Sequence, residues 1–309
     1  LSMQLSAAAD WAWIPIVIWA AFAQTIRNAT QRTLVSELGT LAATLVRFLY
    51  GLPFAALWLL IVHFGTATPL AWPPFSPVYG AWLVLGAVAQ LVATACLLTA
   101  MKQRNFIIGV TFSKTEVLQV GIFATLFLHE VPSLGSGIAM VLATVGVVLL
   151  SMPRKLAPGT VAWGGNAAWF GLASGACFAL SSVGYRGAAL ALPDTSPWLI
   201  GAWAVLLAQT LQTVLLGGWL SVRQPGTLAA TARAWRLSLL AGMMGALASI
   251  GWLTAVALRP AVDVRTLGLV EVLFSYLVSR QFFKERMTLR EISGLLLVTA
   301  GVLAVCAQL

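Results

Sequence analysis

EVLQVGIFATLFLHE (residues 116–130) and EVLFSYLVSRQFFKE (residues 271–285) are two stretches of this chain that align without a gap. Both begin with Glu-Val-Leu and both close with Glu, so the spacing between the two acids is the same. The same offset of 155 residues also aligns the segments that follow, placing Gly146 over Gly301. Two acids in matching places of apolar segments are hard to obtain by chance. We therefore infer that the chain contains an internal repeat.

The repeat belongs to a chain that is too apolar to fold as a water-soluble domain. Of its 309 residues, 60% are apolar and only 9% are charged, and the mean hydropathy is +0.92. Soluble domains carry roughly 25% charged residues. This composition excludes a soluble enzyme, a disordered tail and a coiled coil, and it leaves the lipid bilayer as the solvent.

Apolar runs bounded by charge, Pro or Gly predict ten membrane-spanning helices, each needing about 20 residues to cross the hydrocarbon core. The runs are continuous and do not alternate with polar residues, which excludes barrel strands. We place the spans near 11–32, 38–63, 77–101, 105–128, 133–152, 166–188, 197–221, 234–258, 262–283 and 288–308.

One linker divides the ten spans equally. Residues 153–165, PRKLAPGTVAWGG, combine two prolines, three glycines and two cations. We expect a first five-helix repeat at 3–152 and a second at 166–309, together forming one membrane domain. Five is an odd number, so the repeats must have opposite orientations, and inverted repeats are a transporter architecture. The predicted fold is an all-α polytopic membrane protein.

Lysine and arginine residues in the loops predict the orientation. The odd-numbered loops hold fourteen of them and the even-numbered loops only three, Arg186, Arg259 and Arg265. The fourteen are Arg27, Arg32, Arg47, Lys102, Arg104, Arg154, Lys155, Arg223, Arg233, Arg236, Arg280, Lys284, Arg286 and Arg290. Both termini are therefore predicted outside the cytoplasm, and the net charge of +9 reflects topology and not nucleic-acid binding.

Ionisable side chains at membrane depth are few, and they cost about 2.5–3.5 kcal/mol each on insertion scales. Lys114 and Glu116 lie in the fourth span, and Glu271 lies in the ninth with Arg265 near its start. Glu116 and Glu271 are equivalent in the repeat. They predict either a polar lining of a substrate path or a proton-binding carboxylate. A second interpretation is structural, with Lys114 or Arg265 paired to a carboxylate and holding the two halves in register.

Aromatic and hydrogen-bonding residues recur at helical spacing in several spans, and flat apolar walls with a few polar groups suit an amphipathic organic molecule. Aromatic residues also gather at membrane interfaces whatever the function, although Trp19 and Trp252 lie deeper than the other tryptophans. The candidate substrate-binding residues are Tyr79, Trp82, Gln90, Lys114, Glu116, Trp163, Ser181, Ser249, Trp252 and Glu271.

Small residues form stripes in the fifth and tenth spans. Gly135, Ala139 and Gly146 lie on one stripe, and Gly294 and Gly301 on the other. Such stripes predict close helix packing, either within the chain or between copies of it.

Motifs for enzymatic chemistry are missing from the sequence. It has no Walker motif, the run HEVPS at 129–133 lacks the second His of a zinc protease, and its three cysteines lie far apart in apolar runs. We therefore predict no catalytic residue, no metal site and no cofactor. No basic region precedes the first apolar run, so a cleaved signal peptide is not expected.

The pattern of ten spans in two halves, with each fourth helix of a half framed by two glutamates, resembles the drug/metabolite transporter superfamily and its EamA-type exporters. Glu116 to Glu130 and Glu271 to Glu285 carry the resemblance, although Val117 replaces the family's common Pro. Within the family the chain is most similar to the YddG-type exporters of aromatic and other apolar amino acids. The resemblance implies a basket-like bundle around a central cavity walled by spans one, three, four, six, eight and nine.

The function predicted from these features is export of small amphipathic metabolites, foremost aromatic and other apolar amino acids, across a bacterial inner membrane by alternating access. Lys114, Glu116 and Glu271 would form the polar end of the site, and Tyr79, Trp82, Trp163 and Trp252 would stack on the substrate. Drugs, sugars or nucleotide-linked compounds are the alternative substrates, and an intramembrane enzyme is the third alternative. The expected partners are a small-molecule substrate and the bilayer, with no nucleic acid and with the oligomeric state open.

Overall fold

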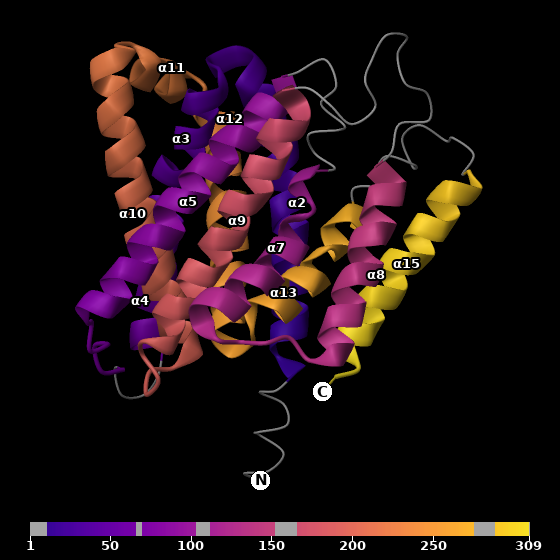
Figure 1. Cartoon of the computed structure of the whole chain (residues 1–309). Helices are drawn as coiled ribbons and strands as arrows, with labels where there is room; N and C mark the ends of the chain where they lie inside the picture. Colours follow the sequence, from indigo (N-terminus) through magenta and orange to yellow (C-terminus); the bar gives the residue numbers. More distant parts are fainter. Residues whose placement is uncertain (1–10, 66–69, 103–111, 152–165, 275–287, 309) are drawn as a thin grey trace. The chain divides into compact units, whose positions relative to one another are not determined.

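The structure, a computed structural model, describes residues 11–65, 70–102, 112–151, 166–274 and 288–308 (Figure 1). All the regular secondary structure in these ranges is helical. The helices are α2 (Trp13–Leu38), α3 (Thr40–Leu49), α4 (Leu52–Phe64), α5 (Pro77–Lys102), α7 (Glu116–Phe123), a π-helical turn (Ala124–Leu128), α8 (Leu134–Ser151), α9 (Asn166–Leu190), α10 (Pro197–Arg223), α11 (Thr227–Arg233), α12 (Trp235–Leu258), α13 (Ala261–Gly268) and α15 (Leu289–Cys306).

Six of the described helical segments are long and apolar enough to cross a membrane, the first of them made of α3 and α4 together. They are Thr40–Phe64, Pro77–Ala100, Leu134–Ser151, Pro197–Arg223, Trp235–Leu258 and Leu289–Cys306, and their bounds agree with six of the predicted spans. The helices α2 and α9 match two more predicted spans, while parts of 105–128 and 262–283 lie outside the described residues. The exact count of ten therefore stays a prediction.

The chain divides into two compact units, and neither coincides with a sequence half. The first unit combines residues 1–91 with 184–260, and the second combines 92–183 with 261–309. Each unit thus contains segments from both sides of the predicted linker 153–165, which itself lies outside the described residues. The division into repeats at 3–152 and 166–309 remains a prediction about sequence equivalence.

In the first unit, α12 packs against α2, α3, α4 and α10. Buried Leu34, Val46 and Ala241 form one apolar cluster where α2, α3 and α12 meet. Small residues bring the backbones close: a Cβ at Gly242 would overlap the Tyr50 Cβ. Van der Waals packing of this kind holds membrane helices together, because lipid removes the hydrophobic drive between them.

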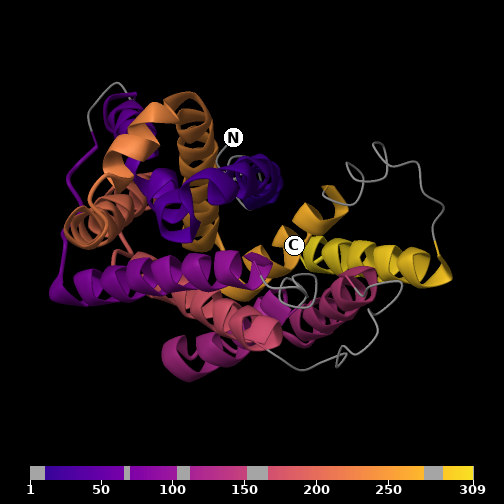
Figure 2. The same cartoon turned by 90° about the horizontal axis from the view of Figure 1, so that it is seen from above.

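In the second unit, α8 and α15 lie side by side in both views (Figures 1 and 2). Their small residues face each other, since a Cβ at Gly146 would lie 2.7 Å from the Gly294 carbonyl oxygen. A Cβ at Gly301 would lie 2.7 Å from the carbonyl oxygen of Ala139. The two predicted stripes of small residues therefore pack against each other within the chain, the first of the two alternatives given by the sequence.

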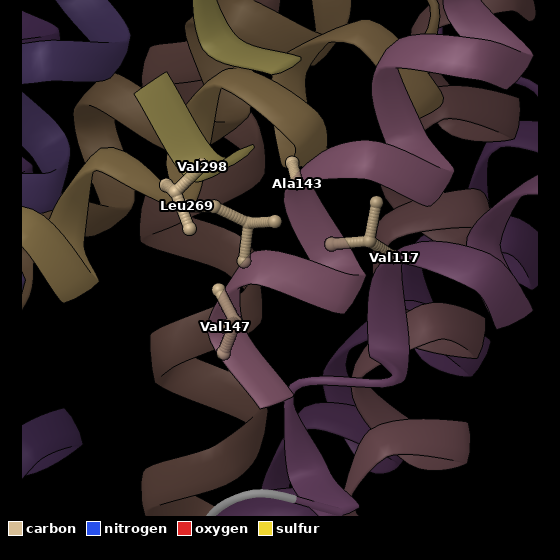
Figure 3. Packing of buried hydrophobic residues seen from close by; sticks show 5 residues of the cluster. All are labelled: Val117, Ala143, Val147, Leu269 and Val298. Atoms are coloured by element: carbon tan, nitrogen blue, oxygen red, sulfur yellow. The ribbon is translucent and has the colours of Figure 1, made fainter. Parts of the chain in front are cut away.

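The apolar cluster of the second unit includes residues next to the acids of the repeat motif. Figure 3 shows Val117, Ala143, Val147, Leu269 and Val298, all buried, pointing toward one another. The opposite face of α8 carries exposed Leu134, Ile138 and Val145. An exposed apolar stripe opposite a packed one is what a lipid-facing helix requires.

Candidate functional site

The helix that carries Glu116 is interrupted immediately before it. Residues 112–113 are helical, Lys114 and Thr115 form a turn, and α7 begins at Glu116. The Thr115 hydroxyl donates to the Phe112 carbonyl at 2.7 Å, and Gln119 Nε2 donates to the Thr115 hydroxyl at 3.0 Å. These side chains supply hydrogen bonds at a point where the helical ladder is broken.

The segment that carries Glu271 is interrupted in the same place. Here α13 ends at Gly268, Leu269 forms a turn, and helical structure resumes at residue 270. Leu269 is the repeat equivalent of Lys114, because the two positions are separated by the same 155 residues as the glutamates. Each glutamate therefore lies in the first turn after a break. Carboxylates are favoured there by the helix dipole, and discontinuous helices of this kind form transport sites at the bilayer midplane.

Two ion pairs join the broken segments. Lys114 Nζ lies 3.3 Å from Glu271 Oε2, and Arg265 Nε lies 3.3 Å from Glu116 Oε1. Each glutamate is thus paired with a cation from the other sequence half. The structural interpretation made from the sequence, a buried cation paired to a carboxylate, accordingly describes the geometry, and both predicted cations take part. We call these four residues the charge cluster.

The charge cluster is largely shielded from solvent and formally neutral. The side chain of Glu271 is 8% exposed and that of Lys114 is 23% exposed. Its two cationic and two carboxylate side chains balance in formal charge, which reduces the cost of holding them in an apolar interior. The neighbouring residues Val117, Leu269 and Val272 belong to the apolar cluster described above. The charge cluster is therefore polar at its centre and apolar around it.

Helix α9 supports the cluster through small and hydroxylated residues. The Arg265 side chain donates through Nε to the Ser182 hydroxyl at 2.7 Å. A Cβ at Gly175 would lie 3.1 Å from the Ser113 carbonyl oxygen, so α9 passes close to the first break. Ser181 was predicted as a substrate contact and is fully buried on α9; its neighbour Ser182, which was not predicted as one, makes the contact with the cluster.

The predicted residue Gln90 belongs to the first unit and lies in a buried hydrogen-bond network. Its Oε1 accepts a hydrogen bond from the Tyr185 hydroxyl at 3.0 Å and another from Gln212 Nε2 at 2.9 Å. Gln212 Nε2 also donates to the Ala87 carbonyl at 2.8 Å. This network joins α5, α9 and α10, and it gives Gln90 a packing role in the described geometry.

The predicted aromatic residues of the first unit each contact a different partner. Tyr79 is buried and stacks near Phe75, whose ring also contacts Trp203. The Trp82 ring lies against Gly187, where a Cβ would approach it to 2.5 Å. Trp252 is buried and its indole N–H donates to Gln24 Oε1 at 3.0 Å.

Three more aromatic and polar predictions have different outcomes. Ser249, one turn before Trp252 on α12, is buried. Trp163 lies outside the described residues. Trp19, expected to lie deeper than most tryptophans, is within α2 and its side chain is 48% exposed; its depth in the membrane stays a prediction. In the described residues, then, ion pairs join the charged predictions, whereas the contacts described for Tyr79, Trp82 and Trp252 are with other residues.

Two arginines that the sequence analysis counted among loop residues are buried inside helices. Arg27 lies inside α2 and Arg47 inside α3, and they are only 3% and 2% exposed. A lone arginine near the end of an apolar run is typical of an interface position, and only packing against other helices shows otherwise. The bias in the loops remains large without these two.

A family model matches the chain twice, over residues 11–152 and again over 165–307, and its description is EamA-like transporter family. The chain belongs to the EamA-like transporter family. This assignment makes it a multi-pass membrane transporter of the drug/metabolite transporter superfamily, as the resemblance predicted, and not an enzyme. The double match agrees with the internal repeat inferred from the two glutamate motifs.

The fold of this EamA-like protein has been seen before. It is similar to a protein of solved crystal structure, described only as "Crystal structure of protein", with a TM-score of 0.65 and 13% sequence identity. The match covers 95% of this chain and 96% of the other. At that identity the likeness concerns the fold alone. No curated protein matches the chain.

Proposed function

We propose that this EamA-like protein exports zwitterionic amino acids with aromatic or other apolar side chains across the bacterial inner membrane, by alternating access. The observation that carries the proposal is the charge cluster, in which two cations and two carboxylates meet at two helix breaks. An amino acid presents one carboxylate and one ammonium group. It can replace one ion pair by pairing its own charges with those of the protein, leaving the site neutral.

The neutrality of the cluster favours this substrate class over the nucleotide-linked alternative. A phosphate-bearing substrate carries excess negative charge and calls for an excess of cations around it. In the charge cluster each cation already faces a carboxylate at 3.3 Å. The apolar residues beside the breaks, including Val117 and Leu269, suit a substrate with an apolar side chain.

The proposal also assigns roles to the two acids. Glu116 and Glu271 would alternate between holding a cation of the protein and holding the ammonium group of the substrate. A substrate that releases one ion pair on binding loosens the tie between the two broken segments. This differential contact is what a ligand needs in order to shift a conformational equilibrium.

Exchange in proteoliposomes tests the proposal. The purified full-length chain is reconstituted, loaded with unlabelled amino acid, and assayed for counterflow of labelled tryptophan, phenylalanine and threonine. Indole-3-propionate lacks the ammonium group and tryptamine lacks the carboxylate, so neither should compete as well as tryptophan. Failure of all three labelled amino acids to enter above empty vesicles would refute the amino-acid assignment.

Variants of the acids distinguish substrate binding from proton coupling. Glu116→Gln and Glu271→Gln should each slow tryptophan exchange about tenfold or more, while Glu37→Gln, an exposed acid on α2, should leave it unchanged. If exchange survives in both Gln variants and only flux driven by a pH gradient is lost, the acids carry protons and do not hold substrate. If exchange and gradient-driven flux both persist at every pH, neither role holds.

A further inference from the structure

Three exposed arginines gather where α10 is connected to α12. Arg223 ends α10, Arg233 ends the short helix α11, and Arg236 lies in the first turn of α12. The connection lies at one end of the first unit (Figure 1). No acid occurs between Asp194 and Asp263, so this connection carries positive charge only.

None of these three arginines forms an ion pair within the described residues. Arg233 Nε donates to the Ala229 carbonyl of its own helix at 3.4 Å. The Arg236 Cζ lies 5.5 Å from the centroid of the Trp235 ring. Glu37 of α2, a helix that contacts α11, is itself exposed and pairs with none of them. The three guanidinium groups are therefore available to an anion from outside the chain.

Hydrogen bonds to the rest of the unit hold α11 in place. Thr231 at its centre is buried, and its carbonyl oxygen accepts hydrogen bonds from the Tyr50 hydroxyl at 3.1 Å and the Ser238 hydroxyl at 3.4 Å. The buried side of α11 is thus tied to α12 and to the end of α3, while Leu228 and Arg233 are exposed. A surface that is ordered before binding loses less entropy when a ligand arrives.

Exposed apolar side chains lie next to the three arginines in the sequence. Trp219 and Val222 precede Arg223 on α10, Leu228 belongs to α11, and Trp235 begins α12. Tryptophan at helix ends is typical of the headgroup region of a bilayer, and arginine beside exposed apolar residues is typical of a segment at the boundary of headgroups and acyl chains. The anion within reach at that level is the phosphate of a lipid.

We propose that Arg223, Arg233 and Arg236 form a binding surface for an anionic phospholipid, whose phosphate they hold while its acyl chains lie along the neighbouring apolar side chains. Guanidinium groups match phosphate oxygens through paired N–H donors. Each basic residue beside a membrane helix strengthens the attraction to anionic lipid about fivefold. A zwitterionic lipid adds an ammonium group to the same phosphate and gains less. This surface is independent of the proposed amino-acid function, whose charge cluster belongs to the other unit.

Native mass spectrometry of the purified full-length protein in detergent tests the surface. Phosphatidylglycerol and phosphatidylcholine with the same acyl chains are titrated in parallel, and the apparent dissociation constant of the first bound lipid is measured for each. We expect phosphatidylglycerol to bind about tenfold more tightly or better, and this preference to weaken as the ionic strength rises. Equal affinities for the two lipids would overturn the proposal.

Substitutions locate the surface. Arg233→Gln and Arg236→Gln should each reduce the preference for phosphatidylglycerol about fivefold, and the triple variant that adds Arg223→Gln should abolish it. Arg259→Gln is the matched control, because Arg259 caps the opposite end of α12, and it should keep the preference. A triple variant with full preference, or an equal loss in Arg259→Gln, would mean that the anionic lipid binds elsewhere and would overturn the proposal.

Two further measurements check the fold of the variants and the source of the phosphate. All three arginines are exposed, so the triple variant should unfold at the same temperature as the unaltered protein without lipid, and phosphatidylglycerol should raise that temperature less in the variant. An equal rise in both proteins would contradict the assignment. Glycerol 3-phosphate carries the phosphate without acyl chains and should displace little bound phosphatidylglycerol, even in large excess. Complete displacement would show that the arginines bind a soluble phosphate ester, which would also overturn the proposal.

Discussion

Replacing Gly146 by alanine should separate α8 from α15. A Cβ at this position would lie 2.6 Å from the Val298 backbone nitrogen and 2.7 Å from the Gly294 carbonyl oxygen. Both atoms belong to the backbone of α15, so no side-chain rotation can relieve the overlap. The two helices must move apart by several tenths of an ångström, and the close packing over that region is lost.

The chain supplies a control on the same helix. A Cβ at Gly137 would meet nothing within 4 Å. Both substitutions exchange glycine for alanine inside α8 and share a gain in helix propensity of about 1 kcal/mol. The difference between them isolates the packing term, which for an overpacked position costs about 1–3 kcal/mol. We therefore expect Gly146→Ala to be less stable than Gly137→Ala by that amount.

Titration with SDS from mixed micelles, followed by circular dichroism, measures the free energy of unfolding of each variant. Gly301→Ala on α15 is a second test of the same helix pair, because a Cβ there would lie 2.7 Å from the Ala139 carbonyl oxygen of α8. Equal stability of Gly146→Ala and Gly137→Ala would refute the reasoning. It would mean that α8 and α15 do not approach each other at Gly146 in solution.

Two further predictions use the same titration. Lys114→Met removes the cation that lies 3.3 Å from the Glu271 carboxylate and should lower the free energy of unfolding by about 1–3 kcal/mol. The loss is smaller than for a fully buried pair because the lysine is partly exposed. The double variant Lys114→Met/Glu271→Leu should recover most of this stability, and no recovery would contradict the pairing. Tyr185→Phe removes the hydroxyl that donates to Gln90 at 3.0 Å and should cost about 0.5–1.5 kcal/mol, so an unchanged stability would show that this hydrogen bond contributes nothing.

Only the acids of the charge cluster and its two candidate cations could be predicted from the sequence, and not how they pair. The equivalence of Glu116 and Glu271 follows from aligning two stretches of sequence. Because acids are scarce at membrane depth, both are candidates for a functional site. The helix breaks could not be predicted in this way, because neither Lys114-Thr115 nor Leu269 contains a proline, the residue that usually indicates an interruption. The choice of partner, Lys114 with Glu271 and not with Glu116 two residues away, depends on how segments far apart in the chain meet.

The arginines show the opposite error. Counting Arg27 and Arg47 among loop residues follows from a rule about where cations usually lie at the membrane, and the rule carries no information about neighbouring helices. Their burial depends on Gly245, more than 190 residues further along the chain, which lets both stems fit.

The sequence by itself determined that this protein lies in a lipid bilayer, that it is helical, and which family it belongs to. A chain with 9% charged residues must satisfy its backbone hydrogen bonds inside lipid, and long apolar helices do so within a single segment. Tertiary structure decided which residues meet: the crossed ion pairs, the packing of the small stripes within the chain, and the grouping into two units that each combine both sequence halves. Those contacts depend on the distance between helix faces, a quantity that composition and spacing along the chain do not contain.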